Sequence, residues 1–360
     1  MNTSTLKKLT PALRQHIIQP TAKSKGKKSG AVSEFAKNTL LHCNGGSTLQ
    51  AALWLKDHLD NGGKLVITLA GALSSFEVGV MLAELIRQDK VHLVSATGAN
   101  HEESYYRYVA HSHYANIPRY TELTPEQEAE LRDAGLRRIT DTFLPEDESV
   151  RIMEPHLLKM WQTAQRTGQR FFPHEYFRRL FAEKLIKPDR LAKTEDCWAY
   201  AAYKKDIPIV IPGFEDSTMG NIFASYTYGG KYRQGKNPIV LDPMIMKTGL
   251  EYFTFLYDWY METAAKHPVA FLQLGGGISA DFPICVVPSL KHDLGLHKQV
   301  RDWAGFIEIG SSPMSYGSYS GAGGKEKITW DKLSTKSYYQ IIQSDVTVVF
   351  PWMAALLLGK

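Results

Sequence analysis

Lys64-Leu-Val-Ile-Thr-Leu69 is a short apolar run that is bounded by glycines on both sides. Its length and its position between turn residues predict a buried strand. A glycine-containing turn follows at residues 70–75, and residues 76–88 then place apolar side chains at helical spacing. Val91-His-Leu-Val94 predicts the next strand, and a second glycine-containing turn follows at residues 95–100. A strand, a helix and another strand in this order predict a parallel sheet with crossover helices.

The same alternation continues through the rest of the chain. Residues 47–59 also carry apolar residues at helical spacing, and residues 124–204 are mainly helical and charged in character. Short apolar runs predict further strands at residues 208–211, 238–241, 269–274, 306–309 and 344–350. The sequence therefore predicts the α/β class, with no internal repeat.

Glycines and small polar residues follow one predicted strand after another. In an open parallel sheet, ligands bind beyond the carboxyl ends of the strands, where such loops converge. Gly275-Gly-Gly277-Ile-Ser-Ala280 follows a predicted strand and fits the pattern G-x-G-x-x-A, in which glycines let a pyrophosphate approach the backbone. Three adjacent glycines are also typical of a plain tight turn. The loops together favour a site of dinucleotide size.

The composition is that of a globular protein, with 44% hydrophobic and 22% charged residues among 360. No apolar run reaches the roughly 18 residues that span a membrane, and the N-terminus does not resemble a signal peptide. Cys43, Cys197 and Cys285 lie far apart and form no CxxC pair. This spacing argues against a zinc site or a disulfide framework and fits a reducing cytoplasm.

The net charge of +5 comes in part from the segment Lys23-Ser-Lys-Gly-Lys-Lys28. No aromatic residues interleave with these lysines to stack on bases, so we interpret the segment as a solvated tether and expect no nucleic-acid partner. His111-Ser-His113 resembles a metal-binding pair, but no cluster of histidines, cysteines and carboxylates accompanies it. We therefore expect a solvent-exposed or capping role for these histidines and no metal.

Glu326-Lys-Ile-Thr-Trp330-Asp331-Lys332-Leu333 places a lysine close to a large aromatic residue and six positions after a carboxylate. A lysine acts as a nucleophile only when its amine is neutral, and an apolar, desolvated wall favours that form. A nearby carboxylate can hold a cationic amine. The stretch therefore suggests Schiff-base chemistry on a polyamine-like ligand. The same residues also fit an exposed Trp-Asp-Lys at the end of an element.

Six blocks of sequence, by their order and spacing, resemble deoxyhypusine synthase, and most of all the bacterial deoxyhypusine synthase-like proteins. The resemblance runs from about Gly46 to Lys360 and implies a Rossmann-like parallel sheet flanked by helices, a homotetramer, and NAD as cofactor. The blocks are Thr97-Gly-Ala-Asn-His-Glu-Glu103, Leu131-Arg-Asp-Ala-Gly-Leu-Arg-Arg-Ile139, Pro212-Gly-Phe-Glu-Asp-Ser-Thr-Met-Gly-Asn221, residues 275–287, Ser315-Tyr-Gly-Ser-Tyr-Ser-Gly-Ala322 and Glu326–Leu333.

The resemblance implies that an aminobutyl group moves from a polyamine such as spermidine to an acceptor amine. NAD takes a hydride from the carbon beside the secondary amine, and diaminopropane leaves as the enzyme lysine attacks, which gives a lysine-imine intermediate. The acceptor amine then displaces the lysine, and the hydride returns. In deoxyhypusine synthase the acceptor is a lysine side chain of a translation factor precursor.

Carried over residue by residue, the resemblance makes Lys332 the imine-forming nucleophile. The residues that it assigns to the substrate are Glu326, Trp330, Asp281, Asn221, Tyr319 and Glu102. The residues that it assigns to the cofactor are Ser74, Ser75, Thr97, Gly98, Glu103, Asp216, Gly276, Ser311, Ser312 and Asp345. These residue types suit NAD, because glycines permit close approach of a pyrophosphate and carboxylates accept hydrogen bonds from ribose hydroxyls.

Four residues depart from the family pattern. Asn221 and Tyr319 stand where the eukaryotic enzyme has carboxylates that hold the polyamine, and each loss removes a charge-assisted hydrogen bond worth roughly 1.5–3 kcal/mol. Asp281 replaces a histidine near the reacting amine, where it either holds the secondary ammonium or takes a proton from it. Asp331 replaces a glycine, and a carboxylate there tends to raise the pKa of Lys332. We therefore expect a different amine, or spermidine in a different pose.

We expect residues 1–30 to form a flexible N-terminal extension and residues 31–360 to form a single catalytic domain. Residues 5–18 could plug a neighbouring active site, as an N-terminal helix does in eukaryotic family members, or could simply dock or remain disordered. Three alternatives stay open for the activity. These are homospermidine synthase-like transfer to a free diamine, a non-catalytic relative that binds NAD or polyamine, and a simple dehydrogenase.

Overall fold

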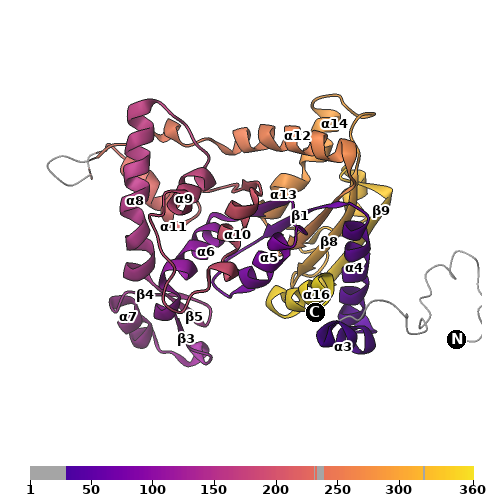
Figure 1. Cartoon of the computed structure of the whole chain (residues 1–360), viewed down its shortest axis with the longest axis horizontal. Coiled ribbons are helices and arrows are strands. Elements are labelled where there is room, and N and C mark those ends of the chain that lie inside the picture. The colour runs from indigo at the N-terminus through magenta and orange to yellow at the C-terminus, as the bar shows by residue number, and fades with distance from the viewer. Residues whose placement is uncertain (1–29, 231, 233–238, 319–320) are drawn as a thin grey trace, which may run out of the picture.

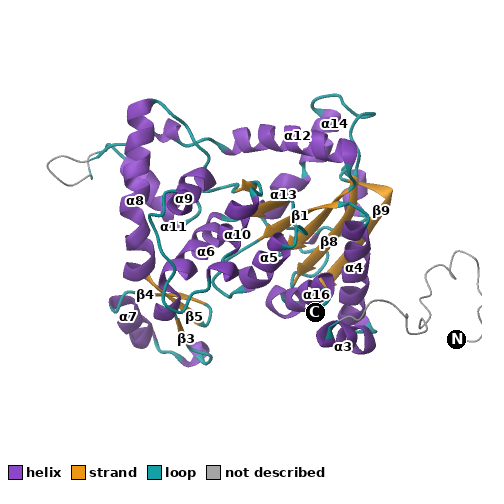
Figure 2. Cartoon of the chain, in the orientation of Figure 1, coloured by secondary structure: helices purple, strands orange, loops and turns teal. Residues whose placement is uncertain are grey.

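The computed structural model describes residues 30–230, 232, 239–318 and 321–360. It is an α/β protein in which a six-stranded parallel sheet is flanked by helices, as the sequence and its resemblance predicted (Figure 1 and Figure 2). The strands of this sheet are β1 (Lys64–Leu69), β2 (Leu93–Ala96), β6 (Ile209–Val210), β7 (Val269–Leu274), β8 (Trp303–Gly310) and β9 (Leu333–Gln343). A separate antiparallel sheet contains β3 (Ala115–Asn116), β4 (Leu136–Ile139) and β5 (Thr142–Pro145).

The helices that contact the large sheet are α4 (Cys43–Asp60), α6 (Gly98–Ala110), α13 (Ile278–Ile284), α15 (Glu326–Thr329) and α16 (Val346–Leu358). The other α-helices are α3 (Ala31–Thr39), α5 (Val78–Arg87), α7 (Pro125–Asp133), α8 (Glu146–Thr167), α9 (Pro173–Ala182), α10 (Trp198–Lys205), α11 (Thr218–Thr227), α12 (Gly249–Lys266) and α14 (Val286–His292). Short 3₁₀ turns occur at His111–His113, Tyr120–Glu122, Thr194–Asp196 and Pro243–Ile245. Among the described residues, no helix is long and apolar enough to cross a bilayer.

The strand order of the large sheet is β6-β2-β1-β7-β8-β9, and every neighbouring pair is parallel. The first strand along the sequence, β1, lies in the middle of the sheet. The next strands of this sheet, β2 and β6, lie on one side of β1, and the last three, β7, β8 and β9, lie on the other side. The order therefore reverses between β1 and β7, where open α/β sheets commonly bind ligands. The carboxyl ends of these strands meet at one edge of the sheet, which we call the carboxyl edge.

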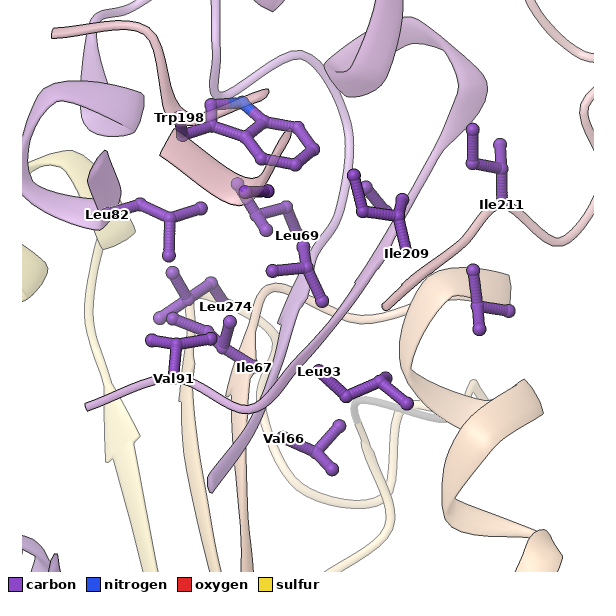
Figure 3. Packing of buried hydrophobic residues seen from close by; sticks show 14 of the residues in the cluster. Val66, Ile67, Leu69, Leu82, Val91, Leu93, Trp198, Ile209, Ile211 and Leu274 are labelled. Atoms are coloured by element: carbon purple, nitrogen blue, oxygen red, sulfur yellow. The ribbon is translucent and has the colours of Figure 1, made fainter. Parts of the chain in front are cut away.

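Two buried faces enclose the central strands. Ile67 and Leu69 of β1 point toward the side where Trp198 of α10 lies, whereas Val66 and Leu93 point to the opposite side (Figure 3). These side chains are almost completely buried on both faces. Parallel strands that are covered on both faces have continuous apolar sequences, which is why β1 and β7 could be predicted.

The prediction of a strand at residues 344–350 is wrong, because α16 occupies Val346–Leu358. Asp345 Oδ1 caps this helix by accepting a hydrogen bond from Thr347 N at 2.7 Å. The β-branched run Val346-Thr-Val-Val349 favoured a strand, but the apolar sequence continues to Leu358, and that length identifies a buried helix. The true edge strand, β9, was missed because most of its side chains are polar and only partly buried.

The predicted strand at residues 238–241 is also absent from the described residues 239–241. Instead, Leu241 N donates a hydrogen bond to Tyr226 O at 2.9 Å, which ties this segment to the end of α11. The predicted N-terminal extension, including the possible plug at residues 5–18, lies outside the described residues apart from Gly30.

Gly305 of β8 provides a test of the packing between the sheet and α4. A Cβ atom at this position would lie 2.1 Å from Trp54 Cη2, and the Trp54 ring stacks on Tyr338 with ring centroids 4.3 Å apart. Gly305→Ala is expected to lower the free energy of unfolding by about 1–3 kcal/mol, because the indole must move out of a packed layer. Denaturant unfolding measures this change.

Gly249→Ala is the matched control, because a Cβ atom at Gly249, the first residue of α12, would have no heavy atom within 4 Å. Alanine favours a helix over glycine by up to about 1 kcal/mol, so this variant should be as stable as the wild type or slightly more stable. Equal losses of stability in both variants would contradict the described packing of α4 on β8.

Candidate active site

Lys332 directly precedes β9, at the amino end of that strand. Its backbone is fixed on both sides, since Lys332 N donates to Lys327 O at 3.0 Å and Lys332 O accepts from Trp303 N at 3.4 Å. The preceding residue, Asp331, has a φ of +52°, which lies in the left-handed region that favours glycine. This conformation gives a physical reason for the glycine that the resemblance led us to expect at this position.

The Lys332 amine points toward α13. Its Nζ atom lies 3.1 Å from Asp281 Oδ1, and the side chains of Lys332 and Asp281 are 12% and 26% exposed. Asp281 reaches this position because α13 begins after Gly275–Gly277, at the carboxyl end of β7, and packs against β1, β2 and β7. Gly277 has a φ of +93°, so the turn that starts α13 suits glycine. Cys285 lies one helical turn further along, with its Sγ atom 3.9 Å from Asp281 Oδ2.

The Lys332 amine is charged in this structure, whereas the sequence suggested a neutral amine. Burial lowers the pKa of Lys332, as expected for a desolvated amine, but the interactions with Cys285 and Asp281 raise it, and the net shift is upward. In the sequence, only the apolar neighbourhood and the adjacent Asp331 indicated the charge of this amine. In this structure the amine is therefore a mostly buried ammonium that is paired with a carboxylate.

Lys332 and Asp281 line a cavity of about 1110 Å³, which we call the lysine pocket. Two more of the predicted substrate residues, Glu326 and Trp330, are in its wall. Trp330 is 63% exposed, so its ring lies at the mouth of the pocket. The remaining wall residues include Phe253, Cys285, Pro288, Ser289, His292, Asp293, Ser315, Gly317, Ala322 and Lys327. The arrangement combines a lysine, carboxylates and aromatic surface, which can hold and react with an amine.

Asp331 does not act on Lys332, although it is the adjacent residue. Its Oδ2 atom lies 2.8 Å from His292 Nε2, on α14. The two side chains therefore point apart, and the carboxylate that raises the pKa of Lys332 is Asp281 rather than Asp331.

The residues predicted to bind the cofactor follow the carboxyl ends of strands in the large sheet. Ser74 and Ser75 follow β1, Thr97, Gly98 and Glu103 follow β2, Asp216 follows β6, Gly276 follows β7, Ser311 and Ser312 follow β8, and Asp345 follows β9. Asn100 holds two of these loops together, because its Oδ1 accepts from Ser74 N at 2.9 Å and its Nδ2 donates to Gly71 O at 2.8 Å. The carboxyl edge therefore gathers the predicted cofactor residues from six loops.

Ser75 and Asp345 share one cavity at this edge, with a volume of about 760 Å³. Arg107, which the sequence reasoning did not single out, also lines it, and its Nε donates to Ser75 O at 3.2 Å. Ser75 Oγ is buried and has no hydrogen-bond partner among the described residues. A buried hydroxyl of this kind needs a partner from a ligand or from water.

Glu102 and Glu103 are buried next to each other on α6. Glu102 accepts hydrogen bonds from Thr218 N at 2.9 Å and Met219 N at 2.8 Å, at the start of α11, while Glu103 accepts one from Ser75 N at 3.1 Å. Desolvation raises the pKa of Glu102 to about 7. Desolvation and the neighbouring Glu102 raise the pKa of Glu103 to about 8. In this chain Glu102 caps a helix and does not reach the lysine pocket.

One further substrate prediction, Asn221, is not brought to the lysine pocket within one chain. Asn221 lies with Asp216 in a different cavity, beside α8, and its Nδ2 donates to Glu215 O at 2.6 Å. Tyr319 lies outside the described residues.

Lys327 is the main residue of the lysine pocket that sequence reasoning passed over. It lies beside Glu326 in the stretch that drew attention to Lys332, so its position in the sequence was a usable signal. His292 and Cys285 gave no such signal, because only the packing of α13 and α14 brings them to the pocket.

The fold and these two groups of residues define a class of protein. The chain is an α/β protein with a Rossmann-like sheet, polar loops at the carboxyl edge, and a pocket in which a lysine meets carboxylates. The family model for deoxyhypusine synthase matches residues 37–357. The chain therefore belongs to the deoxyhypusine synthase family.

Similar proteins agree with this assignment. "Deoxyhypusine synthase-like protein" of Coxiella burnetii is 24% identical over 302 residues, which cover 82% of this chain and 76% of that protein. "Probable deoxyhypusine synthase" of Sulfurisphaera tokodaii is 22% identical over 314 residues, with coverage of 87% and 88%. A solved chain from Entamoeba histolytica, crystallised as a candidate deoxyhypusine synthase, has a TM-score of 0.52 at 11% identity, with coverage of 94% and 96%. The last likeness concerns the fold alone.

The raised pKa of Glu103 predicts a pH-dependent stability. A carboxyl that is protonated in the folded protein and ionised in the unfolded chain lowers the free energy of unfolding by about 1.4 kcal/mol for each pH unit. The contribution of Glu103 is complete below its ordinary pKa of 4.5 and is lost as the pH rises to about 8. Glu103→Gln should therefore make the fall in stability between these pH values shallower, as measured by denaturant unfolding.

Glu130→Gln, at an exposed position on α7, is the control and should leave the pH dependence unchanged. If Glu103→Gln gave the same slope as the wild type, Glu103 would be ionised in the folded protein and its described environment would be incorrect.

Proposed function

We propose that this protein is an NAD-dependent transferase that moves an aminobutyl group from a polyamine to an acceptor amine through a lysine-imine intermediate. One observation carries the proposal. In a member of the deoxyhypusine synthase family, the Lys332 amine lies in a cavity whose wall also contains Asp281, Glu326 and Trp330. We treat residues 31–360 as one catalytic domain, and the acceptor as either a protein lysine or a free diamine.

Asp281 has two partners in the proposed reaction. In the free pocket it pairs with the Lys332 ammonium at 3.1 Å. A polyamine that enters the pocket brings a secondary ammonium, which competes for the same carboxylate. Once Asp281 has turned to the substrate, the buried Lys332 amine loses its proton more readily, because desolvation favours the neutral form. Substrate binding thereby converts Lys332 into a nucleophile.

Glu326 and Trp330 suit the rest of a polyamine. Glu326 is an exposed carboxylate in the wall of the pocket, so it can attract a primary ammonium without a large desolvation cost. The Trp330 ring can cover methylene groups and interact with a cation through its face. These two residues would fix one end of the substrate, while Asp281 holds the secondary amine beside Lys332.

The carboxyl edge fits NAD by residue type. Asp345 offers a carboxylate to a ribose hydroxyl, and the unpartnered Ser75 hydroxyl lines the same cavity. Ser311 and Ser312 offer hydroxyl donors to phosphates after β8. We assign the other residues of this edge to the cofactor on the same grounds, namely Ser74, Thr97, Gly98, Glu103, Asp216 and Gly276. When bound, NAD supplies a hydride acceptor for the carbon beside the substrate amine.

A second copy of the chain is needed to complete this site. The lysine pocket and the cavity of Ser75 and Asp345 share no lining residue. Reacting atoms must approach to about 3–3.5 Å, so we propose that a second copy of the chain brings cofactor residues to the substrate. Met314, Tyr316 and Trp330 are 67%, 66% and 63% exposed near the lysine pocket and offer apolar surface to a partner. We therefore propose a homotetramer, in which Asn221 would act from a neighbouring subunit.

Replacing the nucleophile tests the proposal directly. The protein is incubated with NAD and a panel of polyamines and diamines, reduced with borohydride, and analysed by mass spectrometry. The wild type should give an adduct on the enzyme, and Lys332→Ala should give none while it still binds NAD, because the variant removes only the attacking amine. Lys336→Ala, at an exposed position of β9, is the control and should form the adduct at the wild-type rate.

An adduct that forms on the Lys332→Ala protein would show that the assigned nucleophile is wrong. If the wild type gave no adduct with any amine, the chain would instead be a non-catalytic relative that keeps the fold and the pocket.

A further inference from the structure

The turn that carries Lys332 is a Schellman motif, which closes the end of α15. Lys332 N donates a hydrogen bond to Lys327 O at 3.0 Å. Asp331 N donates one to Ile328 O, also at 3.0 Å. These two bonds are the 6→1 and 5→2 pair with which a helix ends in a left-handed residue. That residue is Asp331, with a φ of +52°, so the direction in which Lys332 leaves the helix depends on the backbone of Asp331.

Aspartate is an unusual residue at this position of the motif. A residue with a Cβ atom is disfavoured in the left-handed region, and helices that end in this way usually have glycine there. A short polar side chain is tolerated when it finds a hydrogen bond nearby. The conformation of Asp331 therefore depends on contacts that a glycine would not need.

Two residues at the end of α14 supply such contacts. Lys291 Nζ donates a hydrogen bond to Asp331 O at 3.3 Å. His292 Nε2 lies 2.8 Å from Asp331 Oδ2. The first contact holds the backbone of Asp331 and the second holds its side chain. We call these two contacts the α14 clamp.

The backbone half of the clamp is firmly built. Lys291 is only 7% exposed, and its amine also pairs with Asp302 Oδ1. Asp302 directly precedes β8, and Trp303, the first residue of that strand, donates from its N atom to Lys332 O at 3.4 Å. The turn that carries the nucleophile is thus held between the end of α14 and the start of β8.

The side-chain half of the clamp works in both charge states of the histidine. An ionised carboxylate only accepts hydrogen bonds, and both the neutral Nε2–H tautomer and the protonated ring of His292 can donate one. The His297 ring packs edge-on against the His292 ring, with centroids 4.7 Å apart. The side chains of His292 and Asp331 are 51% and 48% exposed. The pair therefore adds little to the stability of the whole protein, and its effect is local.

The clamp bears on two residues of the lysine pocket at once. Trp330 precedes Asp331 and Lys332 follows it, and both line the pocket. If Asp331 left the left-handed region, the hydrogen bonds of the Schellman motif would break. The Lys332 amine would then be displaced from Asp281 Oδ1, which lies 3.1 Å away.

We propose that His292 is a positioning residue for Lys332, because it holds Asp331 in the left-handed conformation that keeps the Lys332 amine beside Asp281. The use of this positioning in catalysis rests on the proposed function. The positioning itself is a property of the free protein.

A double-mutant cycle with glycine tests this role. His292→Ala should slow the formation of the polyamine adduct on Lys332 about 10-fold, because a small displacement of a reacting atom is costly. Glycine adopts the left-handed conformation without the clamp, so in the Asp331→Gly background the same His292→Ala change should alter the rate less than about 2-fold. His292→Gln, whose amide can also donate to Asp331, should recover most of the rate.

The pKa of Lys332 is a second readout that requires neither NAD nor a substrate. Burial lowers this pKa, Cys285 and Asp281 raise it, and the net shift is upward. An amine displaced from these partners should therefore titrate at a lower pH. NMR of ¹³C-methyl-labelled lysines should show a lower pKa of Lys332 in His292→Ala than in the wild type, and no such difference in the Asp331→Gly background.

His42→Ala, at an exposed position before α4, is the control and should leave both readouts unchanged. Thermal unfolding shows whether each variant is folded. Equal losses from His292→Ala in both backgrounds would show that His292 acts by general packing or by touching the substrate, and would overturn the inference. Wild-type values of both readouts in folded His292→Ala would overturn it as well.

Failure of the proposed function gives a different result. If no polyamine adduct forms on the wild type, but the pKa of Lys332 depends on His292 only while Asp331 is present, the transferase proposal fails and the positioning role stands.

Discussion

The Lys332 amine lies 3.1 Å from Asp281 Oδ1, and this contact connects two parts of the fold. Asp281 is carried by the helix that follows β7, whereas Lys332 precedes β9, the edge strand of the sheet. The contact acts on the charge of the pocket, because Asp281 raises the pKa of an amine whose pKa burial lowers. In the proposed reaction, Lys332 becomes a nucleophile only when another cation takes its place at Asp281.

The rest of the arrangement follows from the order of the strands. The reversal between β1 and β7 brings the polar loops to the carboxyl edge, while the lysine pocket is built from α13, α14, α15 and the start of β9. The two groups belong to separate cavities of one chain, and exposed aromatic surface lies beside the lysine pocket. For this reason the proposed chemistry includes a second copy of the chain.

The sequence predicted the central strands and the stretch that lines the pocket, and the reasons are local. β1 and β7 are short apolar runs between glycines, and Glu326, Trp330 and Lys332 are close together in the chain. The helix at Val346–Leu358 and the strand at Leu333–Gln343 were misread, because β-branched residues occur in the helix and polar residues in the edge strand. The pairing of Lys332 with Asp281 depends on how α13 packs, which no local pattern encodes.

The ionisation of Lys332 is the measurement that tests this account most directly. Lysine amines labelled with ¹³C-methyl groups can be titrated by NMR, and the Lys332 signal is identified by its absence from Lys332→Ala. The wild-type amine should titrate above the ordinary lysine value of about 10.4, and in Asp281→Asn its pKa should fall below the wild-type value because burial then acts without the opposing carboxylate. The same midpoint in both proteins would show that Asp281 does not control the amine and would contradict the account.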